Sequence, residues 1–396
     1  DVSRRRKLGG TTAHWGGWSK PLDDTDFEDN NSWDVPAWPI SKQEISSHMP
    51  RARQWTEIDS GDFDVSSIRE THNGKLLPLR KDGAINEQLF RFSPPTRFGD
   101  KYYDELKAQD NLTCLLHANC YELIRDGDKV TSAKVRPLNG NTLEITAQTF
   151  TLAMGGMETT RLLMNLRGDQ NADGEGIYSD HLGRYFADHF GVRPGEILAP
   201  EGLKYSRFGD QSGPIMPVLT FSAGNIRNNG EHNSCMTLQA SAAPESLLTQ
   251  MIIEPRPNPT STLTLTDERC ALGLRRMKLD WQPHEDDFAS AYRLFNALGD
   301  ELGQTGLGRL NLSRPNSNSI RANVSGACHH LGTTRMAADS RDGVVDSNLK
   351  VFGQQNLYVA SSSVFPRYGY SNPTLTIVAL SVRLAQHLAN KSEVAA

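Results

Sequence analysis

The sequence contains few cysteines and none of the spacings that ligate a metal ion. Its five cysteines are scattered over 396 residues and form no C-x-x-C pair, which disfavours both a disulfide framework and a cysteine-rich metal site. The eleven histidines do not cluster at ligand spacing either, so we predict no metal site. We expect five ordinary buried thiols, namely Cys114, Cys120, Cys235, Cys270 and Cys328.

Long apolar runs and blocks of one charge are also missing. The longest apolar run, Thr376 to Val382, is far shorter than the roughly 20 residues of a membrane-spanning helix. Lys and Arg number 42 against 47 Asp and Glu, for a net charge of −5, so we expect neither a nucleic-acid partner nor a membrane span. The short basic run Arg4-Arg5-Arg6-Lys7 is interpreted as a solvated face.

Motifs of several enzyme classes are absent. The chain has no G-x-S-x-G nucleophile elbow, no G-x-x-x-x-G-K-[ST] phosphate loop and no H-E-x-x-H metal helix. What it does have is a hydrophobic content of 37%, which at this length is enough to bury a sizeable core.

The first half of the chain indicates an α/β unit. Two strand-like segments flank Asp126-Gly127, a strong hairpin signal. Farther on, a strand over Phe150–Met154 meets Gly155-Gly156 and continues into a helix over Glu158–Leu166. Strand, glycine pair and helix in this order are typical of a nucleotide-binding lobe, although any tight strand-to-helix connection fits this segment equally well.

The middle of the chain changes character and predicts an antiparallel sheet of about five strands, followed by a helix over Asp286–Gly303. Such a sheet between α/β segments suggests a separate substrate lobe. The predicted strands are Val218–Ser222, Met236–Ala240, Met251–Glu254, Ser261–Thr266 and Leu274–Trp281.

Near the C-terminus, two short strands over Leu349–Phe352 and Asn356–Ala360 precede a loop and a helix. Asn372-Pro373 is a good start signal for that helix, which we expect to run to about Ala389. A helix start offers free N–H groups and partial positive charge, which would stabilise a negative group aimed at it.

Two further segments place polar side chains among glycines. Gly9-Gly10 and Gly16-Gly17 bracket His14-Trp15, so that backbone can approach a flat ligand closely; a tight structural loop is the alternative. The segment from Cys328 to Met336 holds His329-His330 beside a Gly-Thr turn. A histidine there is a candidate general base, and at most one of two adjacent histidines on an extended segment faces a given site.

Several sequence blocks together resemble the glucose-methanol-choline (GMC) family of flavoprotein oxidoreductases, from Leu8 to about Ala389 and most weakly in the middle sheet. The HWGG and GTTRM variants look closest to sugar-oxidising branches such as pyranose oxidases and glucoside 3-dehydrogenases. The blocks are LGGTTAHWGG, WPIS, LAMGGMETTRLLMN, LGRYFADH, HHLGTTRM, NLYVASSSVFP and SNPTLTIVAL.

The resemblance implies an α/β fold, α+β overall, with two lobes. An FAD-binding, Rossmann-like lobe, incomplete at its N-terminus, would comprise residues 1–48, 105–190 and 326–396. A substrate lobe built on an antiparallel sheet with helices would comprise 49–104 and 191–325.

The resemblance also implies the site. His329 falls on the family's H-x-x-G-T histidine and would take the hydroxyl proton, while a hydride passes to flavin N5; Asn372 would orient the hydroxyl oxygen. His14 falls where some members attach FAD covalently and others carry an unbonded histidine. The implied FAD contacts are Gly9, Gly10, Thr11, Thr12, His14, Trp15, Gly16, Gly155, Ala360, Ser361, Pro373 and Thr374.

One family feature is missing, because no G-x-G-x-x-G fingerprint occurs in the chain. Either the segment that carries it was cut off, is disordered or belongs to another chain, or normal FAD binding is lost. Asp1 as the first residue favours an incomplete chain.

Three functions stay open at this point. The leading prediction is an FAD-dependent enzyme that oxidises a CH–OH group of a sugar or other alcohol, with oxygen, a quinone or a redox protein as electron acceptor. The alternatives are a non-redox lyase of the same family and a catalytically silent subunit that depends on a partner chain. Homo-oligomers or a partner subunit are compatible with each, and a cytoplasmic location is slightly favoured.

Overall fold

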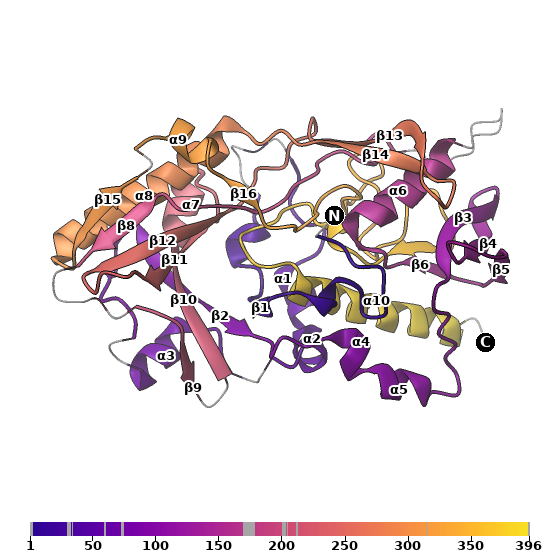
Figure 1. Ribbon diagram of the computed structural model, residues 1–396, viewed down its shortest axis with the longest axis horizontal. Helices are drawn as coiled ribbons and strands as arrows, with labels where there is room; N and C mark the ends of the chain where they lie inside the picture. The colour runs from indigo at the N-terminus through magenta and orange to yellow at the C-terminus, as the bar shows by residue number, and fades with distance from the viewer. Residues whose placement is uncertain are drawn as a thin grey trace.

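The architecture is taken from a computed structural model, in which two halves lie side by side (Figure 1). One half is a large sheet covered by helix α8, and the other surrounds the long helix α10. The structure describes residues 3–29, 33, 35–58, 61–72, 75–168, 179–199, 203, 205–210, 213–313 and 315–394.

The large sheet has ten strands in the described part of the chain, and every pairing within it is antiparallel. Its path runs β1-β2-β10-β11-β12-β7-β16, with β9 paired to β10, β8 to β12 and β15 to β8. The bounds are β1 (Trp18–Ser19), β2 (Ile85–Phe92), β7 (Phe190–Val192), β8 (Gly195–Leu198), β9 (Phe208–Asp210), β10 (Gly213–Phe221), β11 (Cys235–Ala240), β12 (Ser246–Ile253), β15 (Arg309–Leu312) and β16 (Ser325–Gly326).

Helix α8 (Glu285–Thr305) supplies the main cover of this sheet. Acidic residues in its first turn complement the partial positive charge of the helix start, and Gly306 ends it in the left-handed conformation. Its apolar stripe, including Phe288, Phe295 and Leu298, is buried in one core with residues of the sheet strands. Three short helices lie in this half, α3 (Val65–Thr71), α7 (Ala223–Asn229) and α9 (Ser317–Arg321).

The other half contains the one parallel ladder among the described strands, β6 (Phe150–Leu152) beside β17 (Leu357–Val359). Strand β6 leads into α6 (Gly155–Gly168), and β17 is followed by α10 (Thr374–Val394). The remaining elements are η1 (Gly10–Ala13), η2 (Asp24–Asp26), α1 (Lys42–Ser46), α2 (Met49–Trp55), α4 (Phe98–Lys101), α5 (Tyr103–Lys107), β3 (Asn119–Asp126), β4 (Lys129–Arg136), β5 (Leu143–Thr146), β13 (Thr262–Arg269), β14 (Arg275–Asp280) and η3 (Ser362–Val364).

The predicted mixed α/β class is confirmed, as are the hairpin around Asp126-Gly127 and the helices α6, α8 and α10. One part of the predicted middle sheet is wrong, because β13 and β14 form a separate two-stranded hairpin. Their places in the large sheet are taken by strands distant in sequence, such as β2 and β7. The expected strand Leu349–Phe352 is also wrong, since this segment forms only isolated bridges.

The predicted boundaries of the two lobes stay a prediction. Helix α2, expected in the substrate lobe, packs on α10, and the β13–β14 hairpin packs on α6. Strand β1, expected in the FAD-binding lobe, pairs with β2. Short elements that the sequence assigned to one lobe therefore pack in the other half, and this holds for both lobes.

The cysteines differ from the expectation of buried thiols. All five are free, but only Cys235 is fully buried, while Cys114 and Cys328 are exposed.

Membrane-spanning helices are absent from the part of the chain that the structure describes: none of its helices is long and apolar enough to cross a bilayer.

The packing of α8 on the sheet leads to a first prediction. Leu298 is completely buried in that core, so Leu298→Ala should lower the free energy of unfolding by about 2–5 kcal/mol, through lost burial and the cavity left behind. Gln304→Ala on the exposed side of the same helix is the control and should stay within about 0.5 kcal/mol. Urea unfolding followed by fluorescence measures both, and equal losses would contradict this packing.

Candidate active site

A cavity of about 790 Å³ lies where the two halves meet. The large sheet contributes Phe190, Gln250 and Ile252 to its wall. Besides Gly191, which is also in the sheet, the rest comes from five places distant in sequence: 3–18, 154–158, 325–330, Ser362 and 372–377. The cavity is therefore built by tertiary structure rather than by one loop.

The carboxyl ends of the parallel strands face this cavity. Just past β6 come Met154 and Gly155, and just past β17 comes Ser362; all three line the wall. Ligands of open parallel sheets bind at such strand ends. The first residues of α6 and of α10 also line the cavity, so two long helices direct their N-terminal partial charges into it.

A bulge in the backbone brings His329 to the cavity. The segment before β7 pairs with the segment after β16, through a bridge between Ala187 and Leu331 and a pair between Phe190 and Gly326. Two residues separate these contacts on one side and four on the other, so the longer segment bulges outward. His329 lies within this bulge and lines the cavity.

Asp188 fills the bulge from the opposite segment. Its carboxylate accepts the backbone N–H groups of His329, at 2.7 Å, and of Cys328, at 3.0 Å. Cys328 has a φ of 64°, a conformation that costs a non-glycine residue energy and needs such support. Burial raises the pKa of Asp188 to about 6, against the lowering effect of these hydrogen bonds, so the carboxylate is ionised at pH 7.

His329 and Asn372 lie next to each other, with 3.4 Å between His329 Nε2 and Asn372 Nδ2. Burial, then the neighbouring His189 and His330, hold the pKa of His329 well below 6.5. The imidazole is thus neutral at pH 7 and able to accept a proton. The carbonyl oxygen of the Asn372 side chain is buried without a hydrogen-bond partner among the described residues.

Only part of the predicted cofactor-binding loop lines the cavity, and the rest of the loop contacts the surrounding protein. Thr11, His14, Trp15 and Gly16 line the cavity. Gly9, Gly10 and Thr12 do not line it, and the Thr12 hydroxyl instead accepts the backbone N–H of Phe98 at 3.2 Å.

The segment between β2 and α4, which contains Thr96 and Arg97, holds this loop. Arg97 donates to the backbone oxygens of Thr12, at 2.9 Å, and Trp15, at 2.8 Å, while the Trp15 indole donates to the Thr96 carbonyl at 2.8 Å.

The other predicted cofactor residues lie at the strand ends and at the start of α10. Gly155, Pro373 and Thr374 line the cavity. Ala360 and Ser361 do not: the Ala360 N–H extends the ladder to the carbonyl of Leu152, and the buried Ser361 caps η3. Their neighbour Ser362 lines the cavity instead and donates to the carbonyl of His330 at 2.7 Å.

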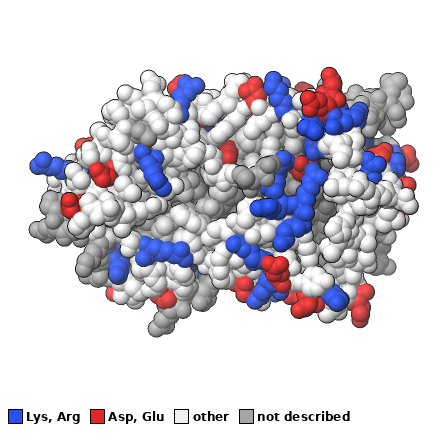
Figure 2. Space-filling model, in the orientation of Figure 1, with Lys and Arg blue, Asp and Glu red and all other residues white. Residues whose placement is uncertain are grey.

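Arginines line the cavity, which sequence reasoning missed. Arg4, Arg5 and Arg6 were expected on a solvated face, but all three lie in the wall, with Arg5 and Arg6 exposed at the same time. Arg4 pairs with Glu158 at 2.7 Å, and Arg6 pairs with the same carboxylate at 3.3 Å. Figure 2 shows Lys and Arg gathered where Figure 1 places the N-terminus.

Asp188 and His189 are the other functional candidates that were missed. His189 Nδ1 lies 2.9 Å from His329 Nδ1, across 140 positions of sequence. The only available signal was the LGRYFADH block, which contains both residues. Nothing in that block by itself indicates which distant segment it would meet.

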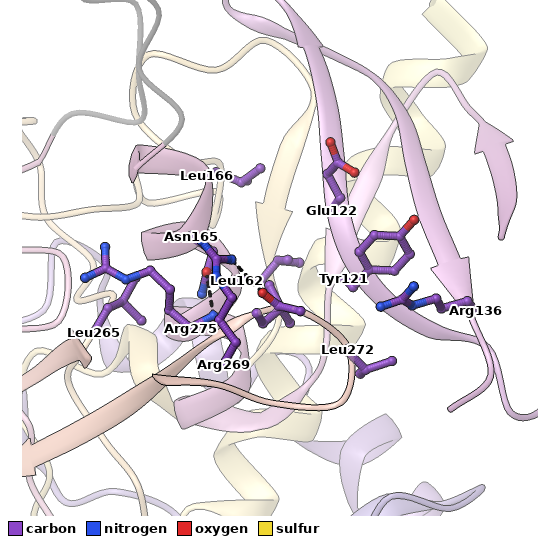
Figure 3. A pocket seen from close by; sticks show the side chains of 12 residues that line it. Tyr121, Glu122, Arg136, Leu162, Asn165, Leu166, Leu265, Arg269, Leu272 and Arg275 are labelled. Atoms are coloured by element: carbon purple, nitrogen blue, oxygen red, sulfur yellow. Dashed lines mark hydrogen bonds between the residues drawn. The ribbon is translucent and has the colours of Figure 1, made fainter. Parts of the chain in front are cut away.

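A second cavity, of about 360 Å³, lies among α6, the β3–β4 hairpin and the β13–β14 hairpin (Figure 3). Its arginines are engaged locally: Arg269 donates to the Gly273 carbonyl, Arg275 to the Thr266 carbonyl, and Arg136 lies over the ring of Tyr121. Glu122 pairs with Lys134. The local structure thus accounts for most of these polar groups, although Arg136 Nε is buried without a hydrogen-bond partner among the described residues.

In the described residues, no three His, Cys, Asp or Glu side chains converge on a point where a metal ion could bind. The chemistry of the large cavity is therefore that of two helix starts, a neutral histidine, an amide and a rim of arginines.

Comparison with known proteins points to the same family as the sequence motifs. Residues 257–381 match the model of the GMC oxidoreductases, and the resemblance found in the sequence is confirmed. The fructose dehydrogenase large subunit of Gluconobacter japonicus is 24% identical, covering 97% of this chain and 80% of that protein. The C-glycoside 3-oxidase of Microbacterium trichothecenolyticum is 26% identical, covering 68% of this chain but only 52% of that protein.

A solved structure agrees at the level of the fold. The FAD-dependent oxidoreductase from Chaetomium thermophilum superposes with a TM-score of 0.62 at 15% identity, covering 97% of this chain and 86% of that one. Residues 257–381 thus match a GMC oxidoreductase domain, and the chain as a whole is similar to oxidoreductases of this type.

Gly332, just after the bulge, provides a second prediction. It has a φ of +83°, and a Cβ there would lie 2.1 Å from the carbonyl oxygen of Tyr185. Gly332→Ala should therefore lower the free energy of unfolding by about 3 kcal/mol or more. The matched control is Gly306→Ala, where φ is +70° and the space is open, with an expected loss of about 1–2 kcal/mol. Similar losses for the two variants in urea unfolding would refute the close contact.

Proposed function

We propose that this GMC-type oxidoreductase binds FAD and oxidises a CH–OH group of a sugar or glycoside. One observation carries the proposal: a neutral histidine and an amide lie side by side, 3.4 Å apart, in a large cavity at the carboxyl ends of parallel strands. The relatives named as a fructose dehydrogenase subunit and a C-glycoside 3-oxidase support a sugar substrate.

The residues around the cavity fit an anionic, flat cofactor. Two helix starts and three arginines favour negative charge, as the diphosphate of FAD requires. The unpartnered carbonyl oxygen of Asn372 is a buried acceptor that a ligand donor would satisfy. We infer that Thr11, His14, Trp15, Gly16, Pro373 and Thr374 contact the ring system and that Gly155 and the arginines face the diphosphate.

The chain's own contribution to the reaction is acid–base chemistry and positioning. When bound, FAD supplies the two-electron acceptor for a hydride from the carbinol carbon. His329 Nε2 takes the hydroxyl proton, which raises the electron density on the oxygen and favours hydride loss from the adjacent carbon. The Asn372 amide donates to the same oxygen and holds it against the imidazole.

The experiment that tests this function combines colour and turnover. The purified chain should show a flavin absorbance band and should reduce an artificial quinone acceptor, or oxygen, with members of a panel of hexoses and glycosides. Colour that stays in an acid-precipitated pellet would support a covalent bond at His14. A colourless chain would support the silent or partner-dependent subunit, and flavin without electron transfer would support the lyase.

We predict that His329→Gln lowers kcat/KM by about 10²- to 10⁴-fold, because the general base is lost. His117→Gln, an exposed histidine outside the cavity, is the matched control and should keep wild-type activity. The flavin spectrum of both variants shows whether the cofactor site is intact. Turnover by His329→Gln within threefold of wild type would disprove the assigned role.

The pKa of His329 also predicts the pH dependence. A base must be unprotonated to act, and its pKa lies well below 6.5, so the acidic limb of kcat/KM should have its midpoint below pH 6.5. Stability has to be followed in parallel, because burial lowers the pKa of His189 from 6.5 to about 4. For His189 the unfolded state binds the extra proton, so its contribution to stability is lost as pH falls from about 6.5 towards 4, whereas the raised pKa of Asp188 acts in the opposite direction over that range. An acidic limb at pH 7 or above, in a folded enzyme, would contradict the prediction.

A further inference from the structure

The imidazole of His189 stands between a backbone carbonyl and the imidazole of His329. Its side chain is completely buried. His189 Nε2 lies 2.7 Å from the carbonyl oxygen of Gly369, and His189 Nδ1 lies 2.9 Å from His329 Nδ1. The two rings are nearly perpendicular, at 86°. Both nitrogens of His189 are thus engaged, and each partner restricts which of them carries hydrogen.

The positions of the hydrogens follow from these partners. A carbonyl oxygen can only accept, so His189 Nε2 must donate. Burial lowers the pKa of His189 to about 4, so the ring is neutral at pH 7 and its Nδ1 is a bare acceptor. His329 Nδ1 must then donate, because two bare nitrogens at 2.9 Å would repel each other.

We propose that His189 is a positioning residue that fixes the tautomer of His329, with hydrogen on Nδ1 and the free lone pair on Nε2. Nε2 is the nitrogen beside the Asn372 amide. The tautomer assignment rests on hydrogen bonds within the chain. Its catalytic consequence rests on the proposed function, in which Nε2 accepts the substrate proton.

The carbonyl that starts this chain of hydrogen bonds is itself held rigidly. The N–H of Gly369 donates to Glu254 Oε1 at 2.8 Å. Gly369 has a φ of +54°, and a Cβ there would lie 2.6 Å from Asp26 Oδ2. Gly369 is therefore held through its N–H by Glu254 and through its C=O by His189.

The backbone and the ring of His329 are held by Asp188 and His189, which are consecutive in the sequence. Asp188 accepts its N–H at 2.7 Å, and His189 accepts from its ring. The titratable groups that face His329 are His189 and His330, with Asp188 on its backbone. Burial and then the charge of Arg4 lower the pKa of His330 to about 4, so both neighbouring imidazoles are neutral at pH 7.

Two substitutions of His189 separate its two hydrogen bonds. In His189→Asn the amide oxygen is as many bonds from Cβ as ring Nδ1, so an acceptor for His329 is retained. In His189→Gln the amide nitrogen is as many bonds from Cβ as ring Nε2, so the donor to Gly369 is retained, while the amide oxygen lies one bond too far from Cβ to replace ring Nδ1 as the acceptor for His329. Each variant therefore removes one of the two hydrogen bonds: His189→Asn loses the one to Gly369, and His189→Gln loses the one from His329.

The first measurement is the tautomer itself, in ¹⁵N-histidine-labelled full chain at pH 7, with the His329 signals assigned from His329→Gln. Long-range ¹H–¹⁵N correlation should show His329 protonated on Nδ1 in the wild type and in His189→Asn, and a tautomer mixture in His189→Gln. Hydrogen on Nε2 of wild-type His329 overturns the proposal, even if neither variant folds. An unchanged Nδ1–H tautomer in folded His189→Gln also overturns it.

Turnover then tests the consequence. His189→Gln should lower kcat by about tenfold or more with little change in KM, whereas His189→Asn should stay within threefold of wild type. Equal kcat values for the two variants would overturn the positioning role. If the tautomers behave as expected but His329→Gln retains full turnover, the proposed function fails while the tautomer assignment stands.

Discussion

The bulge opposite Asp188 is the constraint on which the candidate site depends. It joins the two halves of the molecule, because β7 and β16 belong to the large sheet while Leu331 leads towards the parallel ladder. In a regular antiparallel ladder, successive side chains point alternately to the two faces of the sheet. No side chain would then point outward from the end of the sheet. The extra residues break that alternation, and one carboxylate satisfies two of the amides that the break sets free.

Electrostatics in the cavity come mainly from backbone and fixed side chains. The starts of α6 and α10 contribute partial positive charge without any titratable group. His189, His329 and His330 are kept neutral because burial lowers the pKa of each. Preorganised dipoles of this kind need no rearrangement when charge develops on a reacting oxygen, which is the usual basis of electrostatic catalysis.

Sequence reasoning succeeded where a signal was local. Asn372-Pro373 marks the start of α10, and the His329 motif marks the histidine that lines the cavity beside it. It failed where pairing is long-range. The β13–β14 hairpin has the same alternation as the strands of the large sheet, and only tertiary contacts decide that it packs on α6 instead. The same holds for His189, whose buried position gives no hint of a partner 140 residues away, and for Arg4, whose basic run is typical of a solvent-exposed segment.

The division of the cavity wall has an evolutionary consequence. His329 and Asn372 come from segments in the C-terminal part of the chain, whereas Phe190, Gln250 and Ile252 reach the same space from strands of the large sheet. Side chains on those strands can change without altering the hydrogen bonds that hold the histidine. Under the proposed function, substitutions in the sheet could therefore change the substrate while His329 and Asn372 stay unchanged. The limit to this freedom is Arg97, because it ties the loop that holds His14 to the segment that follows β2.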